Sequence, residues 1–505
     1  MIKYKENLHL SRVSIIAAME CNLSCDYCVI AHRQQKNKKN NKDSKEKSLF
    51  QKTVEALESG AYLENVKKVF NRVDGDRKHV DAFEIWGMEP TLILKYFTPK
   101  WKDWYHYFPN VNRVFFSTNG MDHMDDIVAF VKEVEKWSEN RMSLQIQVSY
   151  DGDYGEDFVR HGSQEKIENN LHYLIKELNN VKLENLEVNI FLHGVLSKPL
   201  LKKFAEEPET IVNYIKNSDA FLDGLNAINF NDRIRVGSFS APPELNYIYT
   251  TKEGQTTFEA LRNMSMIESK YFYENPKSHW CGSHGVFGNI VDELASLMLK
   301  ERCFNLDDYV EKFGLKNNSY WSDHTDFCGA VIHDLKITYD GRSMLCQNMI
   351  HDLNLEVDPL EPSMEEWAIK NIVDNYGAVN FITATDEEID KAIYWGATLN
   401  NNNCYNFMTH TVANFMYLLA SCGQISGSYL YDEKKLMRHA FLLAVIGVCY
   451  YNNMIETGSN IIYSISLIKN YCNGIMDIIE EHINRNVDER KHFNLNDLRG
   501  KDGEW

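Results

Sequence analysis

Short apolar segments alternate with helical segments along the first half of the chain, and this alternation constrains the fold more than any other feature. Segments with the length and composition of strands lie at 12–21, 80–90, 112–120, 143–152 and 186–197. Segments with helical spacing lie between them, at 50–63, 124–139 and 164–180. Strands that alternate with helices form a parallel sheet with right-handed crossovers. We therefore expect an α/β fold whose ligands bind at the carboxyl ends of the strands.

The length of the chain predicts more than one domain. Its 505 residues exceed the roughly 250–300 residues over which one hydrophobic core grows. We place the α/β domain at residues 1–240, a second region at 241–375 and a helical domain at 376–505. The helical domain opens with a capping box, in which Thr385 and Glu388 are spaced to satisfy each other's backbone N–H groups.

Charge and hydropathy narrow the choice of partners and compartment. The formal net charge of −18 disfavours a nucleic-acid partner, because phosphate binding depends on clustered Lys and Arg. The longest nearly apolar run, at 440–451, is too short for the roughly 20 residues that span a bilayer, and we expect no membrane partner. The N-terminus shows no secretory signal pattern. We expect a cytoplasmic protein with reduced thiols, so that its eleven cysteines are ligands or core residues.

Three of these cysteines lie directly after the first predicted strand. Cys21, Cys25 and Cys28 have the spacing C-x3-C-x2-C, and His32 follows four residues later. In one interpretation His32 completes a structural zinc site, which takes four protein ligands. In the other, the three thiolates bind three irons of a [4Fe–4S] cluster and leave the fourth iron open. On these residues alone both interpretations stand.

Polar signatures follow the next three strands in the same way. The second strand ends in Gly-Met-Glu-Pro at 87–90, the third in Ser-Thr-Asn-Gly at 117–120 and the fourth in Ser-Tyr-Asp-Gly at 149–152. Because parallel strands end on one edge of a sheet, we expect these signatures to gather with the cysteine loop. An isolated zinc knuckle does not account for that arrangement.

Residues 10–240 resemble the radical S-adenosylmethionine (SAM) enzymes. The cysteine loop is similar to their C-x3-C-x2-aromatic-C signature, and Gly-Met-Glu-Pro is similar to their Gly-Gly-Glu-Pro motif, with Met88 replacing the second Gly. The resemblance favours the cluster over zinc and implies a partial (β/α)6 barrel. It also implies that SAM chelates the open iron and that one electron cleaves SAM to a 5′-deoxyadenosyl radical. The cofactor carries this chemistry, and the protein positions and shields it.

The same resemblance implies which side chains hold SAM. Glu89 would accept hydrogen bonds from the SAM ammonium, and Gly87 would let the backbone approach closely. Arg160 lies in the stretch Asp-Phe-Val-Arg-His-Gly at 157–162 and could pair with the SAM carboxylate. Ser117 and Asn119 would reach the amino-acid group or the ribose of SAM, and Ser149 would reach the ribose. Tyr27 would shelter the adenine side of the cluster.

The second region contains a further pair of cysteines. Cys328 and Cys346 flank a segment of period two with an Asp340-Gly341 turn, which predicts a hairpin with a thiol on each arm. This pattern resembles the opening of the auxiliary-cluster domains called SPASM and twitch. The dense cysteine run of a full SPASM domain is missing, so we infer one auxiliary Fe–S cluster. The third ligand is assigned to Cys404, with Cys281 and Cys303 as alternatives. In the competing interpretation, Cys328 and Cys346 are two buried thiols on a hairpin that binds no cluster.

The substrate is not determined by any residue, and neither is a catalytic base. Gln347 stands where sulfatase-maturing relatives carry an Asp, and an amide cannot act as a base; His351 or Asp352 could substitute. Auxiliary-cluster domains mostly serve peptide modification, so we expect an enzyme that abstracts hydrogen from a peptide or protein side chain, leading to a cross-link or an oxidation. The electron would come from a reductant such as flavodoxin or ferredoxin. One alternative is an oxidoreductase acting on a sugar-like alcohol, and another is a non-catalytic, zinc-stabilised interaction module.

Overall fold

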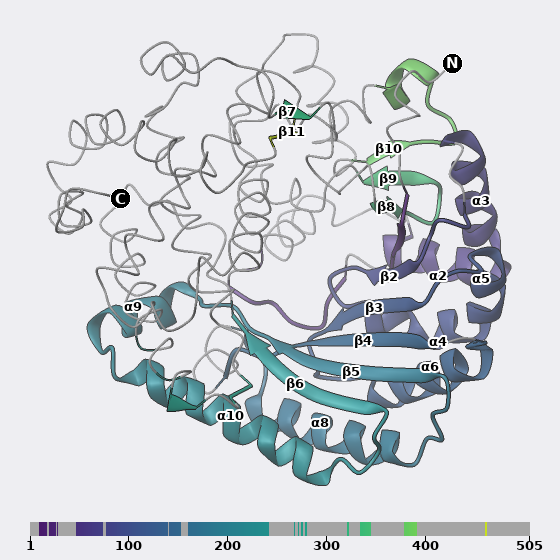
Figure 1. Cartoon of the computed structure of the whole chain (residues 1–505). Helices are drawn as coiled ribbons and strands as arrows, with labels where there is room; N and C mark the ends of the chain where they lie inside the picture. Colours follow the sequence, from purple (N-terminus) through teal and green to yellow (C-terminus); the bar gives the residue numbers. More distant parts are fainter. Residues whose placement is uncertain are drawn as a thin grey trace, which may run out of the picture.

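The computed structural model (Figure 1) describes two main stretches and several shorter ones. The first stretch covers residues 10–17, 20–26, 28, 47–73, 77–139, 141–152 and 160–241. The second covers 334–344 and 378–390. Short pieces are described at 267, 271, 274–275, 278–279, 321–322 and 460–461. The structural statements below concern these residues.

A parallel sheet forms the centre of the described fold. Its first six strands pair in chain order and all run in the same direction. They are β1 (Arg12–Ile16), β2 (Ala82–Trp86), β3 (Arg113–Thr118), β4 (Met142–Ser149), β5 (Leu186–His193) and β6 (Ile234–Ser240). The predicted α/β fold with a parallel sheet is thereby confirmed. Closure into a partial barrel stays a prediction.

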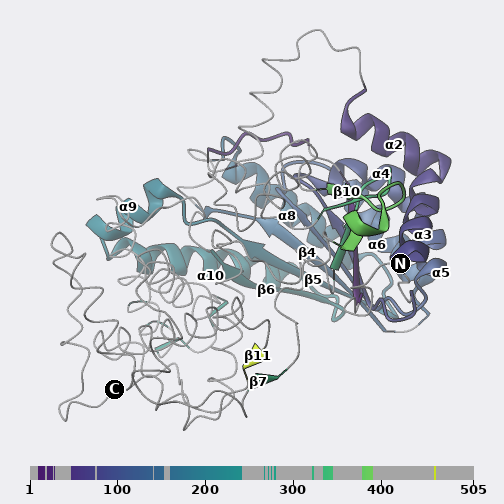
Figure 2. The same cartoon turned by 90° about the horizontal axis from the view of Figure 1, so that it is seen from above.

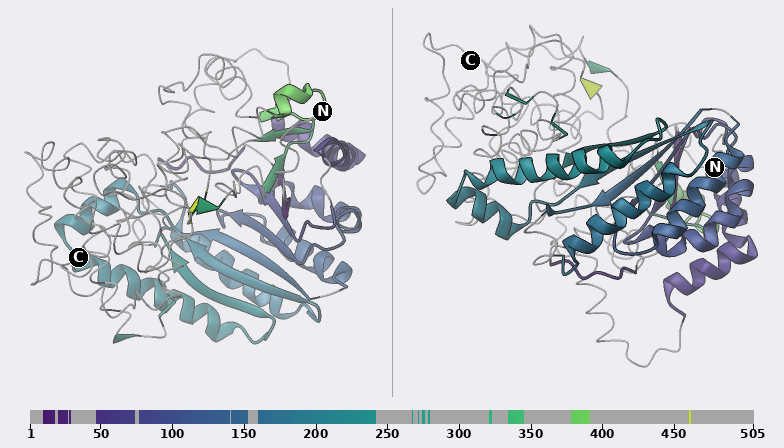
Figure 3. Two further views of the ribbon diagram at one scale, coloured as in Figure 1. Left: turned by 45° about the horizontal axis from the view of Figure 1, so that its top comes forward. Right: turned by 90° about the horizontal axis from the view of Figure 1, so that it is seen from below.

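Helices cover one face of this sheet (Figures 1 and 3). They are α2 (Leu49–Ser59), α3 (Ala61–Val73), α4 (Leu94–Phe97), α5 (Trp101–Tyr107), α6 (Met124–Trp137), α8 (Gln164–Asn179), α9 (Lys198–Glu206) and α10 (Thr210–Ile228), with 3-10 turns η2 (Pro90–Ile93) and η3 (Thr98–Lys100). Aromatic rings fill the layer between sheet and helices, where Phe83 of β2 contacts Phe97, Trp101 and Trp104. Burying such rings is the main favourable contribution to this core.

The other face of the sheet is polar along its later strands. Burial alternates strictly along β4 and β5, with apolar residues buried and the residues between them half-buried. Gln145, Gln147 and Asn189 belong to the half-buried set. Alternation of period two is typical of strands with one apolar and one polar face. Fully buried parallel strands read as continuous apolar runs instead, so this face is one that water or a ligand can reach.

One predicted helix is two helices. The segment 50–63 was expected to be continuous, but α2 ends at Gly60, which has a positive φ of 79°. Glycine adopts this left-handed conformation at little cost and commonly terminates helices there. Ser48 begins α2 with a capping box to Gln51. The sequence reasoning also passed over α5 and α10.

The predicted hairpin in the second region is confirmed. Strands β8 (Asp334–Ile337) and β9 (Arg342–Met344) are antiparallel, and Gly341 makes the turn with a φ of 84°. A Cβ at Gly341 would lie 2.2 Å from a side-chain carbon of Ile382, so a larger residue there would also have to displace that side chain. Strand β10 (Ala378–Asn380) pairs with β9, and the pair β7 (Trp321–Ser322) and β11 (Asn460–Ile461) stands apart from the main sheet.

The hairpin extends the main sheet beyond β1. Strand β8 runs parallel to β1, giving the order β10-β9-β8-β1-β2-β3-β4-β5-β6 for the nine described strands of this sheet. Arg72 of α3 donates hydrogen bonds to the carbonyls of Ile382 and Ala384, 3.1 and 2.7 Å away, and β10 lies beside α3 in Figure 2. The predicted Thr385–Glu388 capping box is also present. The domain boundaries at 240 and 375 stay predictions.

A buried polar cluster joins the hairpin to the first two strands. Ser14 Oγ lies 2.6 Å from Glu84 Oε2 and 2.7 Å from Asp334 Oδ1. Lys336 Nζ donates to Asp334 Oδ2 at 2.5 Å and to Glu84 Oε2 at 3.0 Å. All four residues are buried. We call them the Ser14–Lys336 cluster.

No helix among the described residues is both long and apolar enough to cross a bilayer.

Candidate functional site

The cysteine loop leaves the carboxyl end of β1. Cys21, Cys25 and Cys28 are half-buried, and the backbone N–H of Cys28 donates to the carbonyl of Cys25 at 3.0 Å. Two donors face Cys21 Sγ: the backbone N–H of Leu23 at 3.4 Å and the side-chain Nδ2 of Asn119 at 3.5 Å. The loop is thus held to the end of β3 through one of its thiols.

The three thiols share one electrostatic environment. Burial raises the pKa of Cys21, and burial raises that of Cys25 to about 12. Cys28 raises the pKa of both further, so the three thiols are close enough to repel one another when ionised. Thiolates rather than thiols bind metals, and a bound cation would supply the missing compensation. Three thiols are thus a donor set that a cationic metal group would compensate.

Among the residues that the structure describes, no three Cys, His, Asp or Glu side chains form a group that could hold a metal ion. His32, the fourth ligand in the zinc interpretation, lies outside the described residues, as does Tyr27.

Glu89 follows β2 and is 1% exposed. Its Oε1 accepts from the Thr91 hydroxyl at 2.5 Å and from the Thr118 hydroxyl at 2.8 Å. Its Oε2 accepts from the Asn119 backbone N–H at 2.7 Å. Burial raises the pKa of Glu89 although these bonds lower it. Since a carboxylate oxygen can accept two hydrogen bonds, Oε2 can take a further donor.

The end of β3 supplies side chains to the Glu89 carboxylate and to the cysteine loop. Ser117 is on the polar face of the sheet and half-buried, whereas its neighbour Thr118 is buried and bonds Glu89. Asn119 contacts the cysteine loop and the Glu89 carboxylate directly, and its contact with SAM stays a prediction. The sequence reasoning missed Thr118. The alternation of side chains along a strand is the signal that could have separated Thr118 from Ser117.

Arg160 and Asp151 lie at the end of β4. Arg160 is 2% exposed, and its Nη1 lies 3.9 Å from Asp151 Oδ1. Its positive charge lowers the pKa of Cys25, which places the guanidinium near the cysteine loop. Asp151 also accepts the backbone N–H of Val195 at 2.7 Å. A Cβ at Gly194 would lie 2.5 Å from the Tyr150 carbonyl, so the loops after β4 and β5 approach as closely as glycine allows.

His193 at the end of β5 is a further candidate that the sequence reasoning did not select. It is the register partner of Ser149, the predicted ribose contact, and both are half-buried. Burial lowers the pKa of His193, so its imidazole is neutral near pH 7. A polar side chain at the carboxyl end of a parallel strand is the signal that could have identified it. Gly87, at the end of β2, is half-buried.

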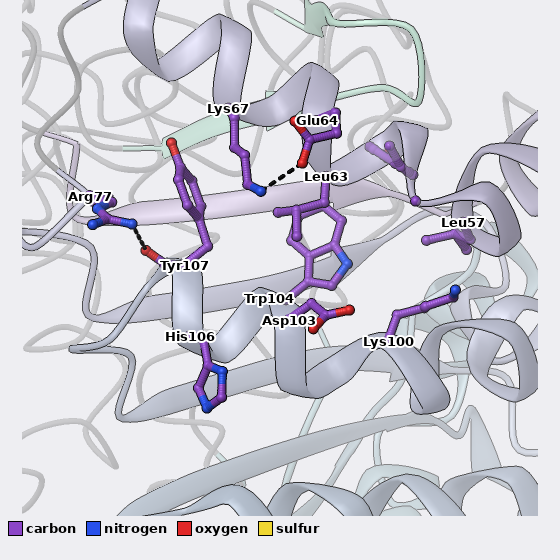
Figure 4. Close-up of a pocket in the computed structure, with 12 residues that line it drawn as sticks. Leu57, Leu63, Glu64, Lys67, Arg77, Lys100, Asp103, Trp104, His106 and Tyr107 are labelled. Carbon is purple, nitrogen blue, oxygen red and sulfur yellow. Dashed lines mark hydrogen bonds and ion pairs between the residues drawn. The ribbon is translucent and has the colours of Figure 1, made fainter.

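A cavity of about 420 Å³ lies elsewhere, among residues of α2, α3 and α5 (Figure 4). Lys67 and Glu64 form an ion pair of 2.6 Å at its edge. Its lining includes Trp104, Arg77 and Tyr107 and none of the residues gathered at the strand ends. It is a feature of the helical layer, separate from the candidate site.

The predicted auxiliary-cluster ligands cannot be compared with the structure. Cys328, Cys346 and Cys404 lie outside the described residues, as do their alternatives Cys281 and Cys303. The described hairpin lies between the first two of them in the sequence.

Comparisons with known proteins give a loose structural likeness. No protein-family model matches the chain, and no curated protein matches it. The chain is similar to Streptococcus suis SuiB bound to S-adenosylmethionine, at 13% identity and a TM-score of 0.35, over 75% of this chain and 69% of that one. It is similar to Streptococcus suis SuiB bound to precursor peptide SuiA, at 12% identity and a TM-score of 0.36, over 75% of this chain and 68% of that one. Likenesses at this level assign no function to the chain.

Proposed function

We propose that this protein is a radical SAM enzyme. The contact of Asn119 with both Glu89 and Cys21 carries the proposal. It joins the loop after β1, the loop after β2 and the end of β3, which are the three segments whose sequences resemble the SAM-binding signatures of that family. A zinc-stabilised interaction module would need no buried carboxylate beside the thiols.

Three side chains would hold the cluster. Cys21, Cys25 and Cys28 would each bind one iron of a [4Fe–4S] group, and the fourth iron would take SAM. When bound, the reduced cluster supplies the electron that breaks a carbon–sulfur bond of SAM and yields a 5′-deoxyadenosyl radical. The chain itself supplies thiolates, a fixed loop and a shielded edge of the sheet.

The charged groups at this edge match the two charges of an amino-acid moiety. The Glu89 carboxylate has capacity on Oε2 for an ammonium donor, and such charge-assisted bonds are about twice as strong as neutral ones. Arg160 offers a buried guanidinium for a carboxylate. Glu89 would have to be ionised to hold the ammonium, and an ammonium ligand would favour that ionised form.

For the substrate we infer a peptide or protein side chain. The polar face beside the site presents the amides of Gln145 and Gln147, which make no hydrogen bond within the described part of the chain. Phe115 and Phe191 stack on the same face with ring centroids 6.3 Å apart. Neutral amides and aromatic rings suit an uncharged polar chain such as a peptide backbone. The same amides could bind the hydroxyls of a sugar-like alcohol, which is the second candidate substrate.

One auxiliary Fe–S cluster on Cys328, Cys346 and Cys404 remains part of the proposal. Reconstituted protein would then contain about eight irons, if both clusters are of the four-iron type. A Cys328→Ala, Cys346→Ala variant should lose about half of the iron and still cleave SAM. About four irons in both proteins would make these thiols core residues.

The experiment that tests the enzyme class is anaerobic purification followed by iron and acid-labile sulfide analysis. Dithionite and SAM are then added, and 5′-deoxyadenosine is measured. We expect iron and sulfide in about equal amounts and a slow release of 5′-deoxyadenosine without substrate. Zinc in place of iron, with no 5′-deoxyadenosine, would overturn the proposal. Candidate peptides and polyols can then be compared by mass spectrometry.

A further inference from the structure

We propose that the side-chain amide of Asn119, held in place by Asn22, positions Cys21 and raises the reduction potential of the cluster. This inference rests on the proposed function, because it assigns a role toward the iron–sulfur group. Neither amide binds iron in the proposed site. Asn119 is a positioning residue that acts through the Cys21 sulfur, and Asn22 is one that acts through Asn119.

The first observation is the set of donors on Cys21. Asn119 Nδ2 lies 3.5 Å from Cys21 Sγ, and the Leu23 backbone N–H lies 3.4 Å from the same atom. Both distances suit hydrogen bonds to sulfur. Donors to a cluster sulfur stabilise the added negative charge of the reduced state, so they make reduction easier. A side-chain donor can be removed by substitution, whereas the Leu23 donor belongs to the backbone.

The second observation is that the orientation of the Asn119 amide is determined by its partners. Its Oδ1 accepts the Met121 backbone N–H at 2.9 Å, which leaves Nδ2 as the end facing Cys21. The same Nδ2 donates to Asn22 Oδ1 at 2.5 Å. Asn119 is 6% exposed. With one proton of Nδ2 on each acceptor, the amide cannot rotate without losing bonds.

The third observation is an anchor for Asn22, which lies between the first two cysteines in the sequence. Asn22 Nδ2 donates to Asp122 Oδ2 at 2.8 Å, and Lys166 Nζ donates to Asp122 Oδ1 at 2.8 Å. A continuous series of contacts therefore runs from α8 through Asp122 and Asn22 to the amide on Cys21. Such outer contacts orient a ligand and tune its metal.

The test is a redox titration at one fixed pH and without SAM. The electron paramagnetic resonance signal of the reduced cluster reports how much of the cluster is reduced at each potential. The Cys328→Ala, Cys346→Ala background isolates the signal of the first cluster. Asn119→Ala removes the donor, and we expect the equilibrium for reduction to fall up to about tenfold, which is about 59 mV for a one-electron couple. Asn119→Asp keeps the acceptor for Met121 and places a carboxylate at the sulfur, so its shift should be larger. Asn22→Ala should give a smaller shift of the same sign.

The matched control is Asn170→Ala. Asn170 holds the same loop, because its Nδ2 donates to the carbonyls of Gly120 and Met121 at 2.9 Å each, but it is not a donor to Cys21. Its potential should equal that of the parent protein. A control shift as large as that of Asn119→Ala would overturn the inference, since loop order would then explain both.

The outcomes separate the inference from the function it rests on. If the parent protein holds no iron–sulfur cluster, the proposed function fails and the inference with it. If the parent holds the cluster and all Asn119 and Asn22 variants titrate at its potential, only the inference fails. Should Asn119→Ala not assemble a cluster, Asn119→Asp and Asn22→Ala still decide the question.

Discussion

The buried charges of two polar groups on the same sheet are compensated in different ways. In the Ser14–Lys336 cluster, two carboxylates meet an ammonium and a hydroxyl within hydrogen-bond distance. At the strand ends, the Glu89 carboxylate meets neutral donors, which are two threonine hydroxyls and backbone N–H groups. A buried charge is stable when it is paired. The first group is therefore complete within the protein, and the second is suited to a cationic ligand.

The Ser14–Lys336 cluster and the candidate site therefore also differ in which segments of the chain they connect. The Ser14–Lys336 cluster connects β8 to β1 and β2, so it specifies where the hairpin docks. The residues around Glu89 and Cys21 connect three loops, with donors and acceptors directed at a shared edge. Removing the ammonium should therefore cost stability in the first group, and removing the Glu89 carboxylate should cost ligand binding in the second.

The largest effect is expected from removing the three thiols together. A Cys21→Ala, Cys25→Ala, Cys28→Ala variant should lose the first cluster and all reductive SAM cleavage, because no protein ligand to that cluster remains. Iron analysis and 5′-deoxyadenosine under dithionite measure both losses. The auxiliary cluster should stay bound, and unfolding should stay close to that of the metal-free parent. Continued 5′-deoxyadenosine production would show that these thiols are not the ligands.

Lys336→Met should destabilise the fold more than Glu89→Gln or Asp334→Asn does. It leaves Glu84 and Asp334 buried without the Lys336 ammonium, and the partly exposed Arg12 then lies 3.9 Å from Asp334 as its remaining cation. Breaking a buried ion pair in this way costs about 3–5 kcal/mol. Denaturant unfolding of the metal-free protein measures the loss. Lys67→Met is the control, because its partner Glu64 is exposed and such pairs are worth about 0–1 kcal/mol. Equal effects of the two substitutions would contradict a compensated cluster.

Glu89→Gln should separate binding from stability. SAM affinity measured by calorimetry should fall by about 1.5–3 kcal/mol, the worth of a hydrogen bond to a charged group. The free energy of unfolding near pH 7 should fall by less than in Lys336→Met. Gln keeps one acceptor oxygen, but its NH2 group faces either the Asn119 N–H or the threonine hydroxyls. Burial raises the pKa of Glu89, so its contribution is fully present below the ordinary value near 4.5 and is lost as pH rises through the raised value. Gln lacks that pH-dependent loss, and a variant that lost as much stability as Lys336→Met would argue against this account.

Asp334→Asn should have the smallest effect. It leaves Glu84 and Lys336 as a neutral pair, so we expect a change within about 1 kcal/mol at pH 7, the net worth of one hydrogen bond. Burial raises the pKa of Asp334, and its contribution is lost as pH rises from the ordinary value of 3.8 through the raised one. The variant should therefore lose less stability than the parent between pH 4 and 8. A steeper loss would reverse the assigned sign.

Local patterns predicted the elements well where they depend on neighbours in the chain. The length and composition of apolar runs located β4 and β5, and a segment of period two with the Asp340-Gly341 turn located the β8–β9 hairpin. The capping box at Thr385 also formed as expected. Where two helices meet at Gly60, the apolar spacing continued across the break, so the pattern alone did not show it.

By itself the sequence determined the parallel α/β fold and the segments that supply the candidate site, since strand ends, turns and cysteine spacing are local properties of the chain. Only the tertiary structure decided which atoms meet. Thr118 rather than Ser117 reaches Glu89, Asn119 reaches Cys21, and β8 pairs with β1 across more than 300 positions of sequence. Strand register and the packing of distant loops set these contacts, and a one-residue change in register sends a side chain to the opposite face. No short stretch of sequence contains that information.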